Sequence, residues 1–130
     1  METLIQITTE PIERSQLDAP PDLPEMGSWV EFFGVVRGME DGRPIQALEY
    51  QAYQEMAIRE MRSILERLDA KNPCLRARII HRIGVIPVGE NAIYVGIASA
   101  HRGEGFTLLA SFMDCLKRDV PIWKVRSIPC

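Results

Sequence analysis

The chain has 130 residues and a formal net charge of −3, from 15 basic and 18 acidic side chains. A chain of this length ordinarily forms one domain with its own core, and 46% hydrophobic and 25% charged residues are typical of globular proteins. The acidic balance argues against a general nucleic-acid binder, and no apolar stretch approaches the length of a membrane span. We therefore expect a single domain over residues 1–130 that binds neither nucleic acid nor a membrane.

The N-terminal residues and the cysteines predict a cytoplasmic protein. The segment METLIQITTEPIERSQ lacks the basic region and apolar core of a signal peptide. Cys74, Cys115 and Cys130 are an odd number without a CxxC pair, which fits a reducing compartment better than a disulfide framework. Cys115 falls in an apolar helical pattern and is interpreted as a core residue. His81 and His101 are twenty residues apart with no ligand cluster, so we expect no metal site and no cofactor.

The first half of the chain predicts strands followed by a helix. LIQITTEPI is typical of a strand, at a sheet edge because Pro11 removes a backbone donor, and the proline-rich residues 13–28 predict a loop. WVEFFGVVR and IQALEYQAY are rich in aromatic and β-branched residues, and the turn GMEDGRP between them predicts a long hairpin. From Gln54 to Ala70 apolar residues recur with helical spacing, which predicts an amphipathic helix. Its buried stripe is expected to be Ala57, Met61, Ile64, Leu65 and Leu68.

The second half predicts further strands and a second helix. LRARIIHRIG alternates, with apolar residues and His81 on one face and three arginines on the other. VIPVGE predicts a turn, NAIYVGIASA a strand, and the segment from Gly103 to Arg118 a helix that Pro121 ends. The buried stripe of this helix is expected to be Phe106, Leu109, Ala110, Met113 and Leu116. Residues 119–130 then leave as an extended segment, and the whole order indicates an α+β protein with two main helices on a mostly antiparallel sheet.

The segment SAHRGEGF places His101 and Arg102 directly between a strand and a helix. A helix N-terminus offers unpaired N–H groups and a partial positive charge, so a guanidinium and an imidazole at this point suit a phosphate. An ordinary helix entry, with a surface arginine and a histidine that caps a neighbour, is the alternative that spacing alone leaves open.

The segment KRDVPIWKVRSIPC holds four basic side chains in an acidic protein. Lys117 lies in the last turn of the expected helix, where the helix dipole stabilises a cation whatever its role. Lys124 follows Trp123 on a segment fixed by Pro121, and Arg126 is expected to alternate with it onto the same face. A disordered tail rarely carries apolar and aromatic residues between its charges. We therefore expect the segment to pack down, with Lys124 directed into a pocket.

Other polar residues have simpler interpretations. Arg37 closes a strand before a glycine turn, where scaffolds often place functional residues, but a solvated arginine at a hairpin is the simpler explanation. The three arginines of LRARIIHRIG are interpreted as a solvated face or a surface for an acidic partner. His81 is interpreted as a core histidine with satisfied hydrogen bonds. Glu31 and Glu49 have no visible partner and are assigned no acid–base role.

Five motifs, VEFFGVVR, LEYQAY, IHRIG, SAHR and LKRDVPIWK, occur in this order between about Trp29 and Lys124. Together they resemble the family of large, catalytic subunits of molybdopterin synthase. The resemblance implies an α/β-hammerhead fold and the conversion of cyclic pyranopterin monophosphate (precursor Z) to molybdopterin. It implies that the sulfur donor is the thiocarboxylate at the C-terminal Gly-Gly of a small ubiquitin-like subunit. It also implies a homodimer of large subunits at the centre of a heterotetramer.

The resemblance further implies which residues act on the substrate. Lys117 and Lys124 would be the catalytic lysines, which position the thiocarboxylate, stabilise oxyanions or donate a proton. The substrate-binding residues would be Val35, Val36, Arg37, His101, Arg102, Lys117, Lys124, Val125 and Arg126. Within this set, Arg37, His101 and Arg102 suit the phosphate of the substrate.

The length of the second helix predicts a site shared by two copies of the chain. His101 and Lys117 are sixteen residues apart, which is roughly 24 Å along a helix that rises about 1.5 Å per residue. A pterin phosphate spans only about half of that length. We therefore expect Arg37, His101 and Arg102 of one copy to meet Lys117 and Lys124 of the other.

Two departures from the family pattern favour a specialised or non-catalytic homologue as the alternative. The family usually continues Trp-Lys with a basic residue and a glutamate, where this chain has Val125 and Arg126. The sequence also ends at Cys130, whereas family members often have a longer basic tail. Such a homologue would keep the fold and bind the small subunit or a phosphorylated ligand. An unrelated phosphate- or nucleotide-binding regulatory domain is a third possibility, but the chain has no glycine-rich phosphate loop.

Overall fold

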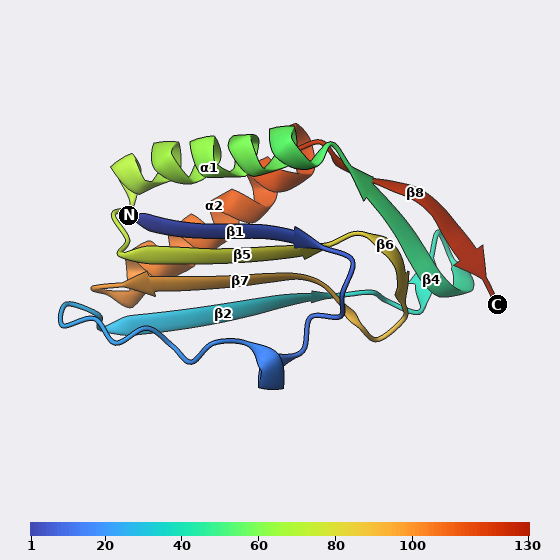
Figure 1. Ribbon diagram of the computed structural model, residues 1–130, viewed down its shortest axis with the longest axis horizontal. Helices are drawn as coiled ribbons and strands as arrows, with labels where there is room; N and C mark the ends of the chain where they lie inside the picture. Colours follow the sequence, from blue (N-terminus) through green and yellow to red (C-terminus); the bar gives the residue numbers. More distant parts are fainter.

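The computed structural model describes residues 1–130 and consists of two small sheets and two long helices (Figure 1). The first sheet has the order β1-β5-β7-β2, formed by Glu2–Thr8, Arg76–Arg82, Asn91–Ser99 and Ser28–Val35. In the second sheet, β4 (Arg43–Ala52) pairs with β3 (Met39–Glu40), β6 (Gly84–Pro87) and β8 (Ile122–Pro129). The helices are α1 (Gln54–Lys71) and α2 (Arg102–Asp119), and neither combines the length and apolarity that a membrane crossing requires. Only β1 and β5 pair in parallel, so the predicted α+β fold with a mostly antiparallel sheet is confirmed, as is the edge position of β1.

Both helices pack on one face of the first sheet and enclose the main core there (Figure 1). α1 buries the stripe that its helical spacing predicts, namely Ala57, Met61, Ile64, Leu65 and Leu68. From the sheet, alternate residues of β5 and β7 point into the same core because successive strand residues face opposite sides. Burial of each large apolar side chain contributes about 1.5–3 kcal/mol, so this layer is the main source of stability.

α2 buries a stripe that matches the predicted one only in part. Its buried residues are Gly105, Leu108, Phe112, Cys115 and Leu116, so Leu116 is buried as predicted, and Leu109 and Met113 are partly buried against the core. Phe106 is instead 56% exposed, and Ala110 is exposed. The cause is a close approach at Gly105, where a Cβ would lie 2.8 Å from the Oγ of Ser99, so only glycine lets the helix rest directly on the end of β7. The prediction that Cys115 is a core residue is confirmed.

The long hairpin predicted between β2 and β4 does not form. β2 pairs with β7, and β4 pairs with β8, so both partners come from later in the chain. Only the short β3 folds back on β4, through a turn in which Asp41 and Gly42 have positive φ. The residues predicted as a turn after Ile83 instead begin with strand β6, which pairs with β4. The chain therefore passes from the first sheet to the second after β2, and the candidate site lies at this junction.

The outer face of the first sheet is not the solvated arginine surface that alternation predicts. The guanidinium of Arg78 lies 5.3 Å from the ring centroid of Trp29. Arg82 is buried, and its Nη1 pairs with Oε1 of Glu90 at 2.7 Å. The arginine of β5 nearest the junction is therefore a structural group that ties this strand to the turn before β7.

Candidate active site

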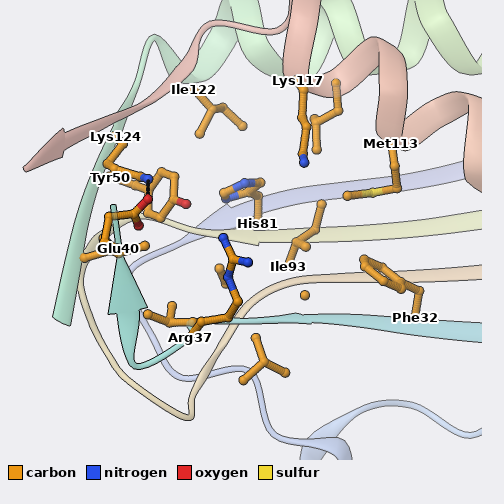
Figure 2. Close-up of a pocket in the computed structure, with 16 residues that line it drawn as sticks. Phe32, Arg37, Glu40, Tyr50, His81, Ile93, Met113, Lys117, Ile122 and Lys124 are labelled. Carbon is orange, nitrogen blue, oxygen red and sulfur yellow. Dashed lines mark ion pairs between the residues drawn. The ribbon is translucent and has the colours of Figure 1, made fainter. Parts of the chain in front are cut away.

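A cavity of about 510 Å³ lies where the two sheets meet the C-terminal half of α2 (Figure 2). Its apolar wall includes Phe32, Ile93, Met113, Leu116 and Ile122. Its polar and charged side chains are Arg37, Glu40, Tyr50, His81, Lys117 and Lys124. A mostly apolar pocket of this volume with a few converging polar groups is typical of a small-molecule site.

Three cationic side chains reach the cavity from separate elements. Arg37 follows β2, Lys117 lies in the last turn of α2, and Lys124 lies on β8. Figure 2 shows Arg37 and Lys117 extending toward each other from opposite sides of the cavity. Neither of these two side chains has an ion-pair partner in the chain. Unpaired cations on a partly apolar cavity favour the binding of an anionic ligand.

The position of Arg37 corrects the grouping expected from the sequence. Arg37 was expected to meet the lysines of another copy, but it lines the same cavity as Lys117 and Lys124 of its own chain. The reason is the path of the chain after β2, which crosses to the second sheet and so passes beneath the C-terminal end of α2. The neighbouring Val35 and Val36 also line the cavity, with Val36 buried and Val35 half exposed.

Lys124 differs from the other two cations because it has a carboxylate partner. Its Nζ lies 2.9 Å from Oε1 of Glu40, which reaches it from β3. The side chains of Lys124 and Glu40 are 38% and 20% exposed, so the pair sits at the mouth of the cavity rather than in its depth. Glu40 could not be identified from the sequence, because its partner Lys124 lies 84 positions later in the chain.

Arg126 lies on the opposite face of β8 from Lys124. On β4, Tyr50 pairs with Lys124 and the adjacent Glu49 pairs with Arg126, so Val125 is an extra residue in a β-bulge. Adjacent strand residues face opposite sides, and Tyr50 lines the cavity, so Glu49 and Arg126 face away from it. There the Nε of Arg126 pairs with Oε1 of Glu49 at 2.7 Å.

This arrangement corrects one expectation about the end of the chain, because Arg126 does not share a face with Lys124. Neither Val125 nor Arg126 lines the cavity within one chain, and their substrate-binding role stays a prediction. The charge change that distinguishes Arg126 from the glutamate of the family pattern therefore falls outside the cavity of this chain. The expectation that the segment packs down is correct, because β8 pairs with β4 along most of its length.

His101 and Arg102 lie at the other end of α2. His101 is the N-cap residue, and Arg102 is the first helical residue, one position before the expected start of the helix; both are exposed. No side-chain hydrogen bond caps the helix here; instead Ser99 Oγ donates to the backbone oxygen of His101 at 2.7 Å. Neither residue lines the cavity, which touches α2 only from Met113 onward. Within one chain, these two residues and Lys117 are therefore separated by nearly the whole helix.

His81 and Tyr50 complete the polar lining, and sequence analysis assigned neither to the site. Their rings meet nearly edge to face, with centroids 5.9 Å apart. His81 Nδ1 lies 2.8 Å from the backbone oxygen of Arg82, so the interpretation as a buried histidine is confirmed, but only one of the two ring nitrogens has a hydrogen-bond partner in the chain. Burial lowers the pKa of His81, because the imidazolium would lose its hydration, and the bond to the carbonyl opposes this only in part. The chain contains no group of three or more side chains that could hold a metal ion.

Comparisons with known proteins agree on one family. Residues 7–119 match the model of the MoaE protein family. A molybdopterin synthase catalytic subunit from Thermoplasma volcanium is 34% identical over 122 residues, which cover 94% of this chain and 89% of that protein. The crystal structure of molybdopterin synthase from Staphylococcus aureus superposes with a TM-score of 0.86 at 31% identity, over 95% of this chain and 90% of that one. A protein–protein complex of subunits 1 and 2 of molybdopterin-converting factor from Helicobacter pylori shares the fold, with a TM-score of 0.65 at 21% identity over 82% of this chain and 73% of that one.

Proposed function

The chain belongs to the MoaE family, and from this premise we propose that it is the catalytic subunit of a molybdopterin synthase, which transfers sulfur to cyclic pyranopterin monophosphate. One observation carries the proposal: Arg37, Lys117 and Lys124 converge on a single cavity that also has an apolar wall. The substrate combines a flat heterocycle with a phosphate. The apolar wall suits the heterocycle, and the cations suit the phosphate.

The proposed sulfur donor is the thiocarboxylate at the C-terminal Gly-Gly of a small ubiquitin-like subunit. The complex from Helicobacter pylori, which contains two subunits, supports a partner of this kind. The thiocarboxylate sulfur bonds to a carbon of the pterin side chain and displaces an oxygen substituent of that carbon, which forms a thioester. Water then attacks the acyl carbon, and the acyl carbon–sulfur bond breaks to leave the sulfur on the pterin and a carboxylate on the small subunit. The attack passes through an oxyanion, which the ammonium of Lys117 or Lys124 stabilises. The same two cations hold the negative thiocarboxylate before the reaction.

We propose that a second copy of the chain completes the phosphate site. His101 and Arg102 are exposed at the far end of α2, about 24 Å from Lys117 along the helix, so they reach a shared ligand only from another copy. The complete site then contains Arg37, Lys117 and Lys124 of one copy and His101 and Arg102 of its neighbour. A homodimer that binds one small subunit at each end gives the heterotetramer.

We propose that the enzyme works in the cytoplasm. Its three cysteines are all free, two of them buried. Burial and the nearby carboxylates of Asp69 and Glu104 raise the pKa of Cys74 to about 11, which keeps this thiol protonated and unreactive. A chain with free thiols and no disulfide fits a reducing compartment.

Turnover with purified components tests the main proposal. The chain is mixed anaerobically with thiocarboxylated small subunit and cyclic pyranopterin monophosphate, and molybdopterin is measured after oxidation to its fluorescent derivative. We expect product in proportion to the thiocarboxylate consumed, two sulfur atoms per pterin. Binding of the small subunit without any product would instead identify a non-catalytic homologue.

A complementation experiment tests the shared site. Chains with His101→Ala and chains with Lys117→Ala are purified separately, and then mixed under conditions that exchange subunits. Each mixed dimer has one site that carries both substitutions and one site that carries neither, so we expect activity to return in the mixture. If mixed dimers form but recover no activity, while both variants fold and dimerise, the site is not shared in this way.

A further inference from the structure

His81 is a buried imidazole at the centre of the cavity. It is the penultimate residue of β5, only 6% exposed, and belongs to the side chains that line the cavity. Figure 2 shows its ring between Tyr50 and Lys117, with Arg37 extending into the cavity from the side opposite Lys117. Its position is fixed by the edge contact with Tyr50 and by the hydrogen bond to its own strand.

The hydrogen bond of His81 determines which ring nitrogen carries the proton. Nδ1 lies 2.8 Å from the backbone oxygen of Arg82, and a carbonyl oxygen can only accept, so Nδ1 carries the hydrogen and donates it. In the neutral ring Nε2 then has a free lone pair. Nε2 has no hydrogen-bond partner in the chain, and it is not among the side-chain nitrogens that are sealed from solvent. The lone pair is therefore available to a molecule in the cavity.

An available neutral nitrogen acceptor distinguishes His81 from the other polar groups of this cavity. Arg37 and Lys117 have only donors to offer, Oε1 of Glu40 is engaged by Lys124, and the hydroxyl of Tyr50 both donates and accepts. Because burial disfavours the imidazolium, His81 remains neutral near pH 7 and does not add a further cation to the anion site. Its chemistry therefore complements a different part of the ligand from the phosphate.

We propose that His81 is a substrate-binding, specificity-determining residue, whose unprotonated Nε2 accepts a hydrogen bond from a ring N–H of the reduced pterin. The inference rests on the proposed function, because that function supplies a ligand with both a phosphate and N–H donors. The cations then hold the phosphate and the sulfur donor, while His81 selects for a heterocycle that has a hydrogen at the matching nitrogen. An N–H that enters the cavity without this acceptor loses its hydrogen bonds to water without replacement.

Two substitutions separate the acceptor from the volume of the ring. His81→Phe keeps an aromatic ring and removes the acceptor, whereas His81→Gln keeps an oxygen that can accept. Binding of cyclic pyranopterin monophosphate is measured anaerobically by calorimetry, with inorganic phosphate as the second probe. We expect His81→Phe to weaken pterin binding by about 10- to 100-fold and His81→Gln by less than about fivefold. Both variants should bind inorganic phosphate within about twofold of the unchanged protein.

Nitrogen NMR of the unchanged protein provides a test that does not depend on a variant that folds. With ¹⁵N-labelled histidine, we expect Nδ1 of His81 to give a pyrrole-like signal and Nε2 a pyridine-like signal in the free protein. Addition of the pterin should move the Nε2 signal in the direction of a hydrogen-bond acceptor, whereas inorganic phosphate should not. An Nε2 that is protonated in the free protein, or that is unmoved by bound pterin, overturns the inference.

The outcomes distinguish this inference from the proposed function. If the unchanged protein neither binds nor converts the pterin, the proposed function fails and the inference fails with it. If the unchanged protein is active and His81→Phe binds the pterin equally well, only the role of His81 is refuted. If both substitutions weaken pterin and phosphate binding alike, His81 is a structural residue of the cavity and the inference is wrong.

Discussion

The two faces of β8 carry the same kind of ion pair in different surroundings. On the inner face Lys124 pairs with Glu40 at 2.9 Å, and on the outer face Arg126 pairs with Glu49 at 2.7 Å. Behind the inner pair lies a cavity with two further cations, whereas the outer pair lies on the surface, with Arg126 63% exposed. The bulge at Val125 alone places these two basic residues on opposite faces.

This comparison shows that pairing distance does not reveal function. Both contacts are short enough for a charge-assisted hydrogen bond, and each has one carboxylate. The inner pair differs because its ammonium also faces a cavity whose other cations are unpaired, so a bound anion can compete with Glu40 for Lys124. The outer pair competes only with solvent and is expected to contribute little to the free energy of unfolding.

Replacement of Lys124 or of Arg126 by alanine should give the largest difference in turnover between the two faces. We expect Lys124→Ala to lower the turnover of molybdopterin synthesis by about 10²- to 10³-fold, since it removes a charge that stabilises an oxyanion. Arg126→Ala should leave turnover within about twofold, because its side chain faces away from the cavity. Steady-state assays with thiocarboxylated small subunit provide the measurement. Equal losses in the two variants would show that β8 does not separate the two residues.

Neutralisation of Glu40 should give a smaller effect of opposite sign, because it strengthens anion binding in the cavity. Glu40→Gln leaves Lys124 without its anionic partner and adds one positive charge to the cavity. We expect inorganic phosphate to bind up to about tenfold more tightly, with a steeper dependence on salt, because screening acts on the added charge. The matched variant Glu49→Gln changes the same kind of group on the outer face. It should leave phosphate affinity unchanged, as calorimetry at two salt concentrations can verify.

The contrast between the faces also marks what the sequence could predict. The helical period specifies α1 and its buried stripe, because side chains of one helix share a face through local geometry alone. Strand pairing depends on residues far apart in the chain, so alternation within WVEFFGVVR and IQALEYQAY could not reveal that β2 pairs with β7 and β4 with β8. The extended segment after Pro121 predicted that Lys124 enters a pocket, and family resemblance supplied most of the other site residues. Regular alternation does not locate a bulge, and it therefore put Arg126 on the wrong face.

His81 illustrates the same limit within the site. An apolar register correctly predicts that its side chain is buried, but burial at the end of β5 means exposure to a cavity that β4, α2 and β8 close. No sequence pattern indicated a role for Glu40, because a lone carboxylate in a predicted turn can be assigned to the site only once Lys124 is known to lie beside it. Both residues were missed because their significance arises from contacts between distant segments.

The stability of the inner face should depend on pH through His81. The pKa of this imidazole is lowered by burial, so below the unfolded-state value of about 6.5 the unfolded chain binds more protons at this position than the folded chain. We expect the contribution of His81 to be fully present above that pH and to fall on acidification, by at most about 1.4 kcal/mol per pH unit.

Chemical denaturation of the unchanged protein and of His81→Gln, at pH values from about 7.5 to about 5, would measure this contribution. The variant should lose less stability on acidification, since it has no group to protonate there. Glu40 is the one carboxylate that lines the cavity beside Arg37, Tyr50, Lys117 and Lys124, so the comparison is repeated in a Glu40→Gln background. Parallel pH curves for the unchanged protein and the variant would contradict the expectation.

The smallest effect is expected for the outer pair, Arg126 and Glu49. A double-mutant cycle with Arg126→Ala and Glu49→Ala isolates their interaction in the free energy of unfolding. Because Arg126 is mostly exposed, solvent screens the pair, and we expect a coupling of about 0.2–1 kcal/mol that shrinks in about 1 M salt. A coupling well above that range would mean that the pair fastens β8 to β4. The ion pair on the outer face would then keep β8 in register and so place Lys124 correctly on the inner face. In that case the activity of the Arg126→Ala variant would fall together with its stability.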